Sequence, residues 1–362
     1  MAKKRDQLAD YRAKRDFDRT PEPSDDRRPT SDEPAADGRF VIQEHHATRL
    51  HWDLRLEHDG VLASWALPRG VPRDPDRNRL AVHTEDHPLE YLDFAGDIPK
   101  GEYGGGWMGI WDRGTYQAEK WERGKVVLRF SGGRVSGRYA LFHTRGKDWM
   151  IHRMDPAEPG EPLPESLAPM LASPGRMPRD AERWGFEVDW RGRRAIALCD
   201  TGHLTLLDAA GDDLRPRLPE LGEITLGLGG EPVALDGVVA VLGDDGAPSP
   251  ERLERRLGAS SDSEIRRRRR NEPATLIIFD LLHQGRERLL DQPYTERRER
   301  LEALELDGPA WRTPAYHPGE GEALREAARR QGLDGVVAKR LESAYAPGER
   351  TRDWRAVPVP KR

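Results

Sequence analysis

Between residues 39 and 155 the sequence consists of short apolar runs separated mostly by glycine, proline, aspartate or asparagine. The runs are Phe40–Ile42, Leu50–Leu56, Leu62–Leu67, Leu80–Thr84, Trp107–Trp111, Lys125–Phe130 and Arg138–His143. Many short strands joined by tight turns are typical of sheets that close on themselves, because closure removes exposed strand edges. This part of the chain is therefore predicted to be an all-β barrel.

The segments around the predicted barrel have different patterns. Residues 1–38 are rich in Asp, Arg and Pro and are interpreted as a mobile N-terminal arm. Residues 156–166 are rich in proline and are interpreted as a linker. Over residues 167–358, apolar strand patterns alternate with helical ones, which predicts an α+β domain.

Composition excludes several classes of protein. The chain has 362 residues, enough for roughly two domains. Its net charge of −5 argues against a strongly basic coat for nucleic acid. The single cysteine, Cys199, excludes an intrachain disulfide and a CxxC metal site. No apolar run approaches the ~20 residues of a membrane span, and the N-terminus leads into charges, so we expect a cytoplasmic protein.

The segment from Leu50 to Leu56 alternates between apolar and polar residues. In a strand, its leucines and Trp52 lie on one face, while His51, Asp53 and Arg55 lie on the other. An imidazole, a carboxylate and a guanidinium then occupy successive positions of the polar face. Two interpretations remain open, namely an ordinary solvated face or a chemical site.

A metal ion explains the polar face if a third ligand arrives from a neighbouring turn. His45 or His46 can supply it, since both precede the strand by a few residues. Two histidines and one carboxylate leave open positions on a divalent ion, as catalysis requires. These ligands accept several divalent metals, so the residue types alone do not select one.

A second polar pattern follows at residues 79–91. The polar residues at odd-numbered positions are Arg79, His83, Glu85 and His87, whereas Leu80 and Val82 stand at even-numbered positions. In a strand, the two sets lie on opposite faces. Arg79 and Arg55 are suited to hold a phosphate group, and His87 is suited to protonate a leaving oxygen. Tyr91 can donate a hydrogen bond to the same anion. An exposed strand is the alternative, but the two segments together favour a metal-assisted phosphoester site.

The first half resembles the phosphoesterase domain of bacterial DNA ligase D over about residues 8–155. The motifs that carry the resemblance are His45-His-Ala-Thr-Arg-Leu-His51-Trp-Asp53-Leu-Arg55-Leu-Glu, Ser64-Trp-Ala-Leu-Pro-Arg-Gly70, Arg79-Leu-Ala-Val, Glu85-Asp-His87-Pro-Leu-Glu-Tyr91, Ile98-Pro-Lys-Gly-Glu-Tyr-Gly-Gly-Gly and Trp111-Asp-Arg-Gly-Thr. The resemblance implies a compact β-barrel that uses Mn²⁺ to trim the 3′ ends of DNA. It implies removal of a terminal 3′-ribonucleoside and then of the remaining 3′-phosphate.

The resemblance also implies a role for each matching residue. The metal ligands are then His45, His51 and Asp53, and the role of His46 stays open. The residues implied to handle the phosphate are Arg55, His87, Arg79 and Tyr91, with Glu85 in support. Within the arm, Arg15 and Glu22 are implied to serve the ribonuclease step.

The second half resembles the adenylation domain of ATP-dependent DNA ligases, which has a nucleotidyltransferase-like fold. Its nucleotidyl-transfer motif, Lys-x-Asp-Gly, supplies a lysine nitrogen that attacks ATP. Here that motif reads Asp189-Trp-Arg191-Gly, and Val238 replaces a metal-binding glutamate. Near the end, Ala356-Val-Pro358 replaces the expected Lys-x-Lys. We therefore expect a degenerate, catalytically inactive ligase-like domain that does not use ATP.

The predicted function is a Mn²⁺-dependent 3′-end phosphoesterase of DNA double-strand break repair by end joining. The expected partners are DNA 3′ ends carrying a phosphate or a ribonucleotide, Ku, and a separate ligase or polymerase, in a nucleoid-associated setting without a membrane. Two alternatives remain, a non-catalytic scaffold that binds DNA ends and an active ATP-dependent ligase. A run of five arginines, Arg266–Arg270, fits either a nucleic-acid contact or the cationic last turn of a helix.

Overall fold

The computed structural model describes residues 6–24, 37–47, 49–99, 101–157, 159–200, 202–243 and 246–359. The chain divides into two compact units, residues 1–158 and 159–362. Among the described residues, no helix combines the length and the hydropathy that crossing a bilayer requires. The remainder of the predicted arm, residues 1–5 and 25–36, lies outside the described residues.

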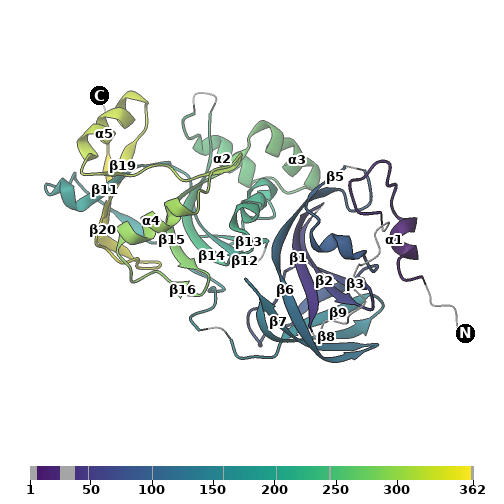
Figure 1. The fold of residues 1–362 in the computed structure, drawn as a ribbon. Coiled ribbons are helices and arrows are strands. Elements are labelled where there is room, and N and C mark those ends of the chain that lie inside the picture. The colour runs from purple at the N-terminus through teal and green to yellow at the C-terminus, as the bar shows by residue number, and fades with distance from the viewer. Residues whose placement is uncertain are drawn as a thin grey trace, which may run out of the picture. The chain divides into compact units, whose positions relative to one another are not determined.

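The first unit is a closed β-barrel of eight strands (Figure 1). Its strands are β1 (Gly38–His46), β2 (Leu50–His58), β3 (Val61–Leu67), β4 (Arg79–His83), β6 (Gly106–Glu122), β7 (Lys125–Gly132), β8 (Ser136–Arg145) and β9 (Asp148–Arg153). The order around the barrel is β1-β2-β3-β4-β9-β8-β7-β6, and β6 closes it by pairing with β1. A short strand, β5 (Gly96–Ile98), extends the sheet beside β6. The predicted all-β barrel is confirmed.

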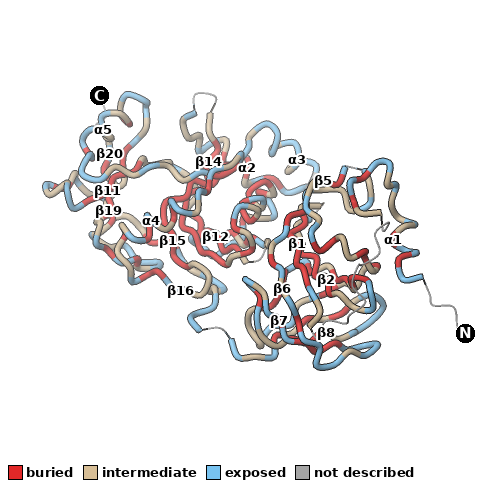
Figure 2. Tube along the Cα trace, in the orientation of Figure 1, coloured by how far each residue is buried: buried red, intermediate tan, exposed pale blue. Residues whose placement is uncertain are grey.

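Alternation along the strands separates the barrel interior from its outer face. Trp52, Leu54 and Leu56 of β2 pack into a fully buried core with apolar residues from β1, β3 and the later strands (Figure 2). The opposite residues of β2 therefore point outward. At the far end of the barrel, Asp112 accepts hydrogen bonds from the amides of Gly133 and Val135, which fixes the turn between β7 and β8.

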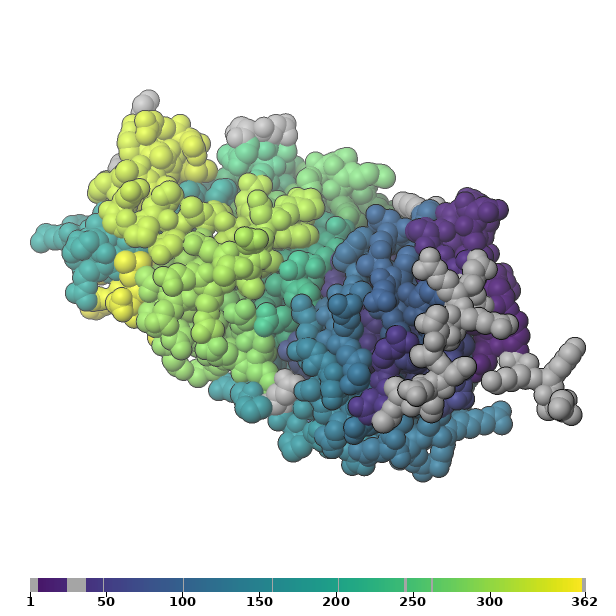
Figure 3. All heavy atoms as spheres, viewed as in Figure 1, coloured from purple at the N-terminus to yellow at the C-terminus, as the bar shows by residue number. Residues whose placement is uncertain are grey.

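The N-terminal segment covers part of the outer face of the barrel. It contains a short helix, α1 (Ala9–Ala13), and its atoms lie over the barrel in Figure 3. Tyr11 is fully buried and packs with Val41 and Met108 of the barrel and with Tyr91 of a 3₁₀ helix, η1 (Leu89–Leu92). Residues 6–24 of the predicted arm thus contribute to a second apolar cluster outside the barrel.

The second unit combines two sheets with helices. Its strands are β10 (Leu171–Pro174), β11 (Trp184–Val188), β12 (Arg193–Asp200), β13 (His203–Asp208), β14 (Val233–Val241), β15 (Ala274–Gln284), β16 (Glu287–Arg288), β17 (Trp311–Arg312), β18 (His317–Pro318), β19 (Gly335–Arg340) and β20 (Arg350–Pro358). One sheet has the order β10-β20-β19-β11-β18, and the other has the order β13-β12-β14-β15-β16, with β17 beside β15.

Six helical segments belong to the described part of the second unit, and two of them, α2 and α3, begin at the serine caps that the sequence contains. They are η2 (Ala181–Arg183), η3 (Pro219–Leu228), α2 (Pro250–Leu257), α3 (Asp262–Asn271), α4 (Tyr294–Ala303) and α5 (Gly321–Arg330). The Ser249 and Ser261 side chains accept hydrogen bonds from the amides of Arg252 and Glu264, so each serine satisfies an amide of the first helical turn. The predicted α+β class is confirmed.

Candidate functional site

Three side chains with metal-binding atoms meet on the outer face of β1 and β2. His45 lies directly opposite His51 across the two antiparallel strands, and Asp53 is two residues further along β2. One ligand atom from each of the three lies within 4.8 Å of the other two. His45 Nδ1 is 3.4 Å from one Asp53 carboxylate oxygen, and His51 Nε2 is 3.6 Å from the other.

Backbone carbonyls fix the orientation of both imidazoles. His45 Nε2 is 2.8 Å from the Gly104 oxygen, and His51 Nδ1 is 3.0 Å from the Arg49 oxygen. A carbonyl oxygen only accepts hydrogen bonds, so each of these ring nitrogens carries the proton. In the neutral rings, His45 Nδ1 and His51 Nε2 therefore present lone pairs toward Asp53.

The Gly104 carbonyl reaches His45 through a tight glycine-rich loop. Gly104 has a φ of +77° and Gly106 a φ of +150°, both in a region that disfavours side chains. A Cβ atom at Gly106 would lie 2.2 Å from the His46 oxygen, so the loop passes directly against β1. The glycine run at 101–106 thus acts on His45 through its backbone, while the Tyr103 side chain lines the cavity.

The charges of the cluster fit a cation. Burial raises the pKa of Asp53, but the adjacent Arg55 guanidinium opposes this effect, and that pKa is held well below its usual range. A carboxylate then faces two ring lone pairs, and His45 Nδ1 is buried without a hydrogen-bond partner. Facing lone pairs repel each other unless a proton or a metal ion lies between them, so this donor set fits a divalent cation.

A cavity of about 250 Å³ opens beside the cluster. The charged side chains that line it are Arg15, Glu22, Asp53, Arg55 and Glu85, next to His45, His51, His87 and Tyr91. Three carboxylates therefore face two guanidiniums, and the charges of these five side chains sum to −1. A phosphate group without a metal ion would gain little electrostatic attraction in such a cavity. A divalent cation reverses the sign of the local charge, which favours binding of metal and phosphate together.

Arg55 lines the cavity, and hydrogen bonds fix its guanidinium. It is 3% exposed and donates to Asp53 (3.0 Å), Gln43 (2.7 Å) and Ser64 (3.1 Å). Its guanidinium carbon lies 4.7 Å from the centre of the Tyr91 ring. Because these contacts come from β1, β2 and β3, the barrel wall itself orients the guanidinium.

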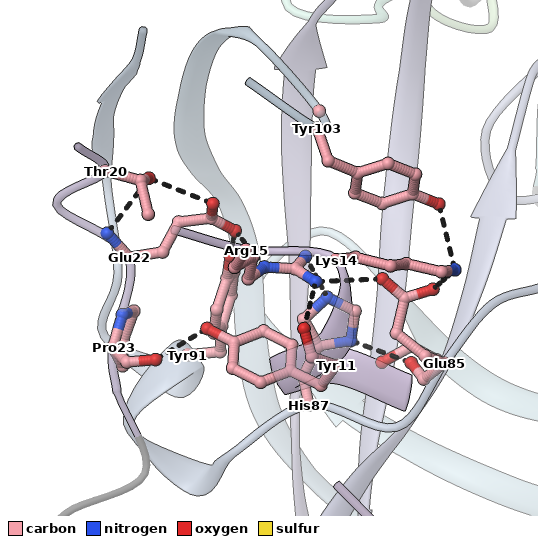
Figure 4. A network of polar contacts seen from close by, with 12 residues as sticks. Tyr11, Lys14, Arg15, Thr20, Glu22, Pro23, Glu85, His87, Tyr91 and Tyr103 are labelled. Atoms are coloured by element: carbon pink, nitrogen blue, oxygen red, sulfur yellow. Dashed lines mark hydrogen bonds and ion pairs between the residues drawn. The ribbon is translucent and has the colours of Figure 1, made fainter. Parts of the chain in front are cut away.

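Two residues of the N-terminal segment, Arg15 and Glu22, line the cavity and bind residues of the barrel unit (Figure 4). Arg15 donates to Glu22 (2.7 Å) and to Glu85 (3.0 Å), and its side chain is 4% exposed. Glu22 also accepts hydrogen bonds from Thr20 (2.9 Å) and from the Tyr91 hydroxyl. These bonds bring the predicted arm residues, Arg15 and Glu22, into the same site as the barrel residues.

His87 accepts a hydrogen bond in this arrangement. Its Nε2 lies 3.2 Å from a guanidinium nitrogen of Arg15, which can only donate. Its Nδ1 donates to the main-chain carbonyl oxygen of Glu85 at 2.8 Å. Burial and the charges of Arg55 and Arg15 hold the pKa of His87 well below its usual range. In this arrangement the neutral ring offers a lone pair to Arg15, and proton donation by His87 to a leaving oxygen stays a prediction.

Arg79 lies outside the cavity, contrary to the sequence-based expectation. It is on β4, and its guanidinium donates to the Arg69 carbonyl. The strand ends at His83, which packs near Trp65 and Trp149 of the barrel, and the chain then turns. The even-numbered spacing of Arg79, His83, Glu85 and His87 does not reflect one continuous strand, and of these four only Glu85 and His87 line the cavity.

Two residues of the site carry no local signal in the sequence. Lys14 binds Glu85 at 2.7 Å and lies 3.3 Å from the Tyr103 hydroxyl, and Tyr103 lines the cavity. Their positions depend on long-range packing of the arm and of the glycine-rich loop. His46 turns away from the cluster, binds Glu44 at 2.6 Å and packs against Trp107.

Residues 43–143 match the family model of the DNA ligase D 3′-phosphoesterase domain, and residues 169–357 match that of the ATP-dependent DNA ligase domain. The chain belongs to the DNA ligase D family. It is 40% identical over 361 residues to the multifunctional non-homologous end joining protein LigD of Mycolicibacterium smegmatis, covering 96% of this chain and 45% of that protein. The Pseudomonas aeruginosa LigD is 36% identical over 403 residues, covering 96% of this chain and 46% of that protein.

A solved structure of mycobacterial DNA ligase D complexed with ATP and MES is 32% identical. The match covers 53% of this chain and 60% of that one, with a TM-score of 0.46. The chain spans less than half the length of the two curated LigD relatives.

In the ligase-like domain of this chain, the residues at the nucleotidyl-transfer motif bind one another. Arg191, with a φ of +44°, pairs with Asp334, and its amide donates to the Asp189 carboxylate at 3.2 Å. The Asp189 amide donates to the Gly335 oxygen at 3.1 Å. The segment after β11 is thus joined to the start of β19 by bonds of Asp189 and Arg191.

Deeper in the same domain, the charged side chains form buried pairs. Lys339 Nζ lies 2.7 Å from Glu187 and 3.8 Å from the centre of the Phe279 ring, and Lys339 is 1% exposed. Burial lowers the pKa of Lys339, although nearby carboxylates oppose the shift. Asp236 binds Arg194 at 2.5 Å and the Tyr345 hydroxyl at 2.7 Å. Each of these charges is compensated within the domain.

Proposed function

We propose that the chain is a Mn²⁺-dependent DNA 3′-end phosphoesterase that acts in double-strand break repair by end joining. The phosphoesterase domain is assigned to residues 39–155, preceded by the arm at 1–38 and followed by a linker at 156–166. Its proposed substrates are DNA ends with a 3′-phosphate or a 3′-ribonucleotide. The LigD relatives support this context, because their names assign them to non-homologous end joining.

His45, His51 and Asp53 are the proposed metal ligands. When bound, a divalent metal polarises a phosphoryl oxygen and lowers the pKa of a bound water. The two histidines are already oriented for this task by the Gly104 and Arg49 carbonyls. Asp53 stays ionised beside Arg55, so it is ready to bind a cation at neutral pH.

Arg55, His87 and Tyr91 are proposed to bind and orient the phosphate. Arg55 offers a guanidinium fixed by the barrel wall, and His87 orients Arg15 by accepting its hydrogen bond. Arg15 and Glu22 are proposed to face the ribose in the ribonuclease step, while Glu85 holds Arg15 in place. Arg79 takes part only if its side chain leaves the Arg69 carbonyl and swings toward the cavity.

The observation that carries this proposal is the convergence of two oriented ring lone pairs and one carboxylate beside a cavity with fixed guanidiniums. It is tested by release of inorganic phosphate from a 3′-phosphorylated DNA primer in a scan across Mn²⁺ and other divalent metals. The double variant His51→Ala/Asp53→Ala should lose activity by about 10³-fold or more, since a metal contributes several kcal/mol to the transition state.

His58→Ala is the matched control, because His58 lies on the same strand but stacks on Trp121 instead of reaching the cluster. It should retain the rate of the unmodified protein. Mn²⁺ should raise the melting temperature of the unmodified protein but not that of the double variant. Unchanged phosphate release in the double variant would refute the site, and DNA-end binding without any phosphate release would favour the scaffold alternative.

We further propose that the ligase-like domain, residues 167–358, is catalytically silent. Asp189 has no amine to attack ATP, and Arg191 and Asp334 bind each other across the motif. A silent domain that keeps its fold is suited to hold DNA or to dock Ku or a separate ligase or polymerase. Deletion of residues 160–362 should then weaken DNA affinity or partner capture in a pull-down.

A further inference from the structure

Two hollows on the second unit are lined by arginines, and they differ in how their charge is balanced. The first lies at α2 and α3 and includes Arg255 and Arg268. Arg255 binds Glu272 at 2.6 Å, and Arg268 binds Glu264 at 2.9 Å and Glu272 at 3.2 Å. The arginine run that stands out in the sequence is therefore partly neutralised by carboxylates of its own helix region.

The second hollow lies beside β10 and β20 and has a volume of about 530 Å³. The parallel pairing of these strands places Ser173 opposite Arg355 and brings the segment after β10 to the same surface. The arginines that line the hollow are Arg176, Arg179, Arg352 and Arg355. The other lining residues are uncharged, so within the described part of the chain no carboxylate lines this hollow.

The arginines of this second hollow have few competing contacts. Arg355 is fixed, because its guanidinium carbon lies 4.3 Å from the centre of the Trp184 ring and its Nε donates to the Arg352 oxygen at 3.2 Å. Arg176, Arg179 and Arg352 are exposed, and within the described part of the chain none of them forms an ion pair with a carboxylate.

Two carboxylates adjoin these arginines in the sequence, but neither lines the hollow. Asp180 accepts a hydrogen bond from the Trp184 indole at 3.2 Å, and Asp353 does not line the hollow. The chain as a whole has a net charge of −5, so an unbalanced group of four guanidiniums stands out against its surroundings. Such a group attracts anions, and planar guanidinium forks bind phosphate oxygens in pairs.

We propose that the hollow lined by Arg176, Arg179, Arg352 and Arg355 binds the phosphate backbone of duplex DNA. Its breadth and its exposed arginines suit several successive phosphates of a strand better than one enclosed anion. The inference rests on the proposed function only in taking DNA as the partner. It assigns the contact to this surface and not to the run Arg266–Arg270.

The test compares two triple variants of the full chain. Arg176→Gln/Arg179→Gln/Arg352→Gln removes exposed charge from the hollow, while Arg266→Gln/Arg267→Gln/Arg270→Gln removes the same charge from the arginine run. Affinity for a fluorescein-labelled blunt duplex is measured by anisotropy over a range of salt concentrations. For the hollow variant, the slope of log affinity against log salt should become shallower by about 3, or roughly one for each arginine–phosphate pair that the substitutions remove.

The arginine-run variant should change this slope by less than about 1. A third variant, Arg176→Lys/Arg179→Lys/Arg352→Lys, should keep most of the slope, because it keeps the charge. Equal losses in the two Gln variants, or a larger loss in the arginine-run variant, would overturn the assignment. Displacement of the duplex by inorganic pyrophosphate at equal phosphate concentration would show a site for small anions and would also overturn it.

At saturating DNA, both Gln variants should release phosphate from a 3′-phosphorylated primer at the rate of the unmodified protein. This readout separates failure of the DNA-contact inference from failure of the proposed function. A loss of phosphate release in the His51→Ala/Asp53→Ala variant with an unchanged salt slope would place chemistry and backbone binding on different surfaces.

Discussion

The two units of this protein use buried charge in different ways. On the barrel, His45 and His51 present ring lone pairs toward a carboxylate, and a cavity lies beside them. In the ligase-like unit, Lys339 pairs with Glu187 and Asp236 pairs with Arg194. The barrel cluster gathers three metal-binding groups beside a cavity, whereas each of these pairs joins one cation to one carboxylate.

The difference shows that buried charge alone does not indicate an active site. A missing hydrogen-bond partner does not indicate one either, because His45 Nδ1 and Lys339 Nζ are both buried without one. The barrel cluster differs in the cavity that lies beside it. A structural cluster pairs each charge with a neighbour, because an unpaired buried charge costs several kcal/mol. This contrast can be tested on both units.

The first prediction concerns covalent adenylation by the ligase-like unit, which is an all-or-none readout. After incubation with radiolabelled ATP and a divalent metal, the unmodified protein should carry no covalent label, since Asp189 has no nucleophilic nitrogen. The variant Asp189→Lys/Arg191→Asp restores Lys-x-Asp-Gly but should also stay unlabelled, because Val238 still replaces the family glutamate. A labelled band from the unmodified protein on a denaturing gel would break the comparison.

The next largest effect concerns stability of the second unit. Arg297 and Asp280 are fully buried and form two parallel hydrogen bonds of 2.8 and 3.0 Å. Arg297→Met leaves the carboxylate unpaired and should lower the free energy of unfolding by about 3–5 kcal/mol. Urea unfolding monitored by hydrogen exchange in the second unit measures the loss.

Arg300→Met is the matched control, because Arg300 lies on the same helix and forms an exposed pair with Glu287. It should change the free energy of unfolding by less than about 1 kcal/mol. Similar losses in the two variants would contradict the view that buried pairs maintain this unit.

The smallest expected effect concerns Asp86, beside the barrel site. Burial, with added repulsion from Asp10 and Glu85, raises the pKa of Asp86 to about 6. A carboxyl with a raised folded pKa stabilises the fold at low pH and loses that contribution as the pH rises from about 4 to about 6. Asp86→Asn should therefore raise stability at pH 7, by roughly 1–2 kcal/mol after allowance for solvent screening.

Hydrogen exchange of the barrel amides between pH 4 and pH 8 measures this effect. The gain from Asp86→Asn should vanish near pH 4, where the aspartic acid is already protonated. Glu85 is the internal contrast, because Lys14 and Arg15 overcome its burial and lower its pKa. A gain that is constant across the pH range would show that Asp86 is ionised throughout.

The fold class and the polar face of β2 were accessible from the sequence, because alternation is a local property. His51, Asp53 and Arg55 lie on one face as their spacing predicts. The choice of His45 over His46 depended on family resemblance, since the register that places His45 opposite His51 is set by pairing between strands. Assignment of chemical roles to these residues stays a prediction.

Other features could not be read from spacing. The placement of Arg79 beside His87 assumed that one strand with alternating faces continues to His87, but β4 ends at His83. Lys14 and Tyr103 meet Glu85 and the cavity only through folding of distant segments. The run Arg266–Arg270 is the most conspicuous group of positive charges in the sequence. The hollow with fewer compensating carboxylates, however, takes its arginines from two segments that are more than 170 positions apart in the chain.

The contacts of His45 and His51 with main-chain oxygens have a consequence for how the site tolerates mutation. The tautomer of each ring is determined by the path of the chain at Gly104 and Arg49, and not by the identity of an adjacent side chain. Substitution of surrounding side chains therefore leaves His45 Nδ1 and His51 Nε2 in place, provided that the backbone of the loop keeps its conformation. Insertions or deletions in the glycine-rich loop, by contrast, should be poorly tolerated even though none of its side chains is among the proposed ligands.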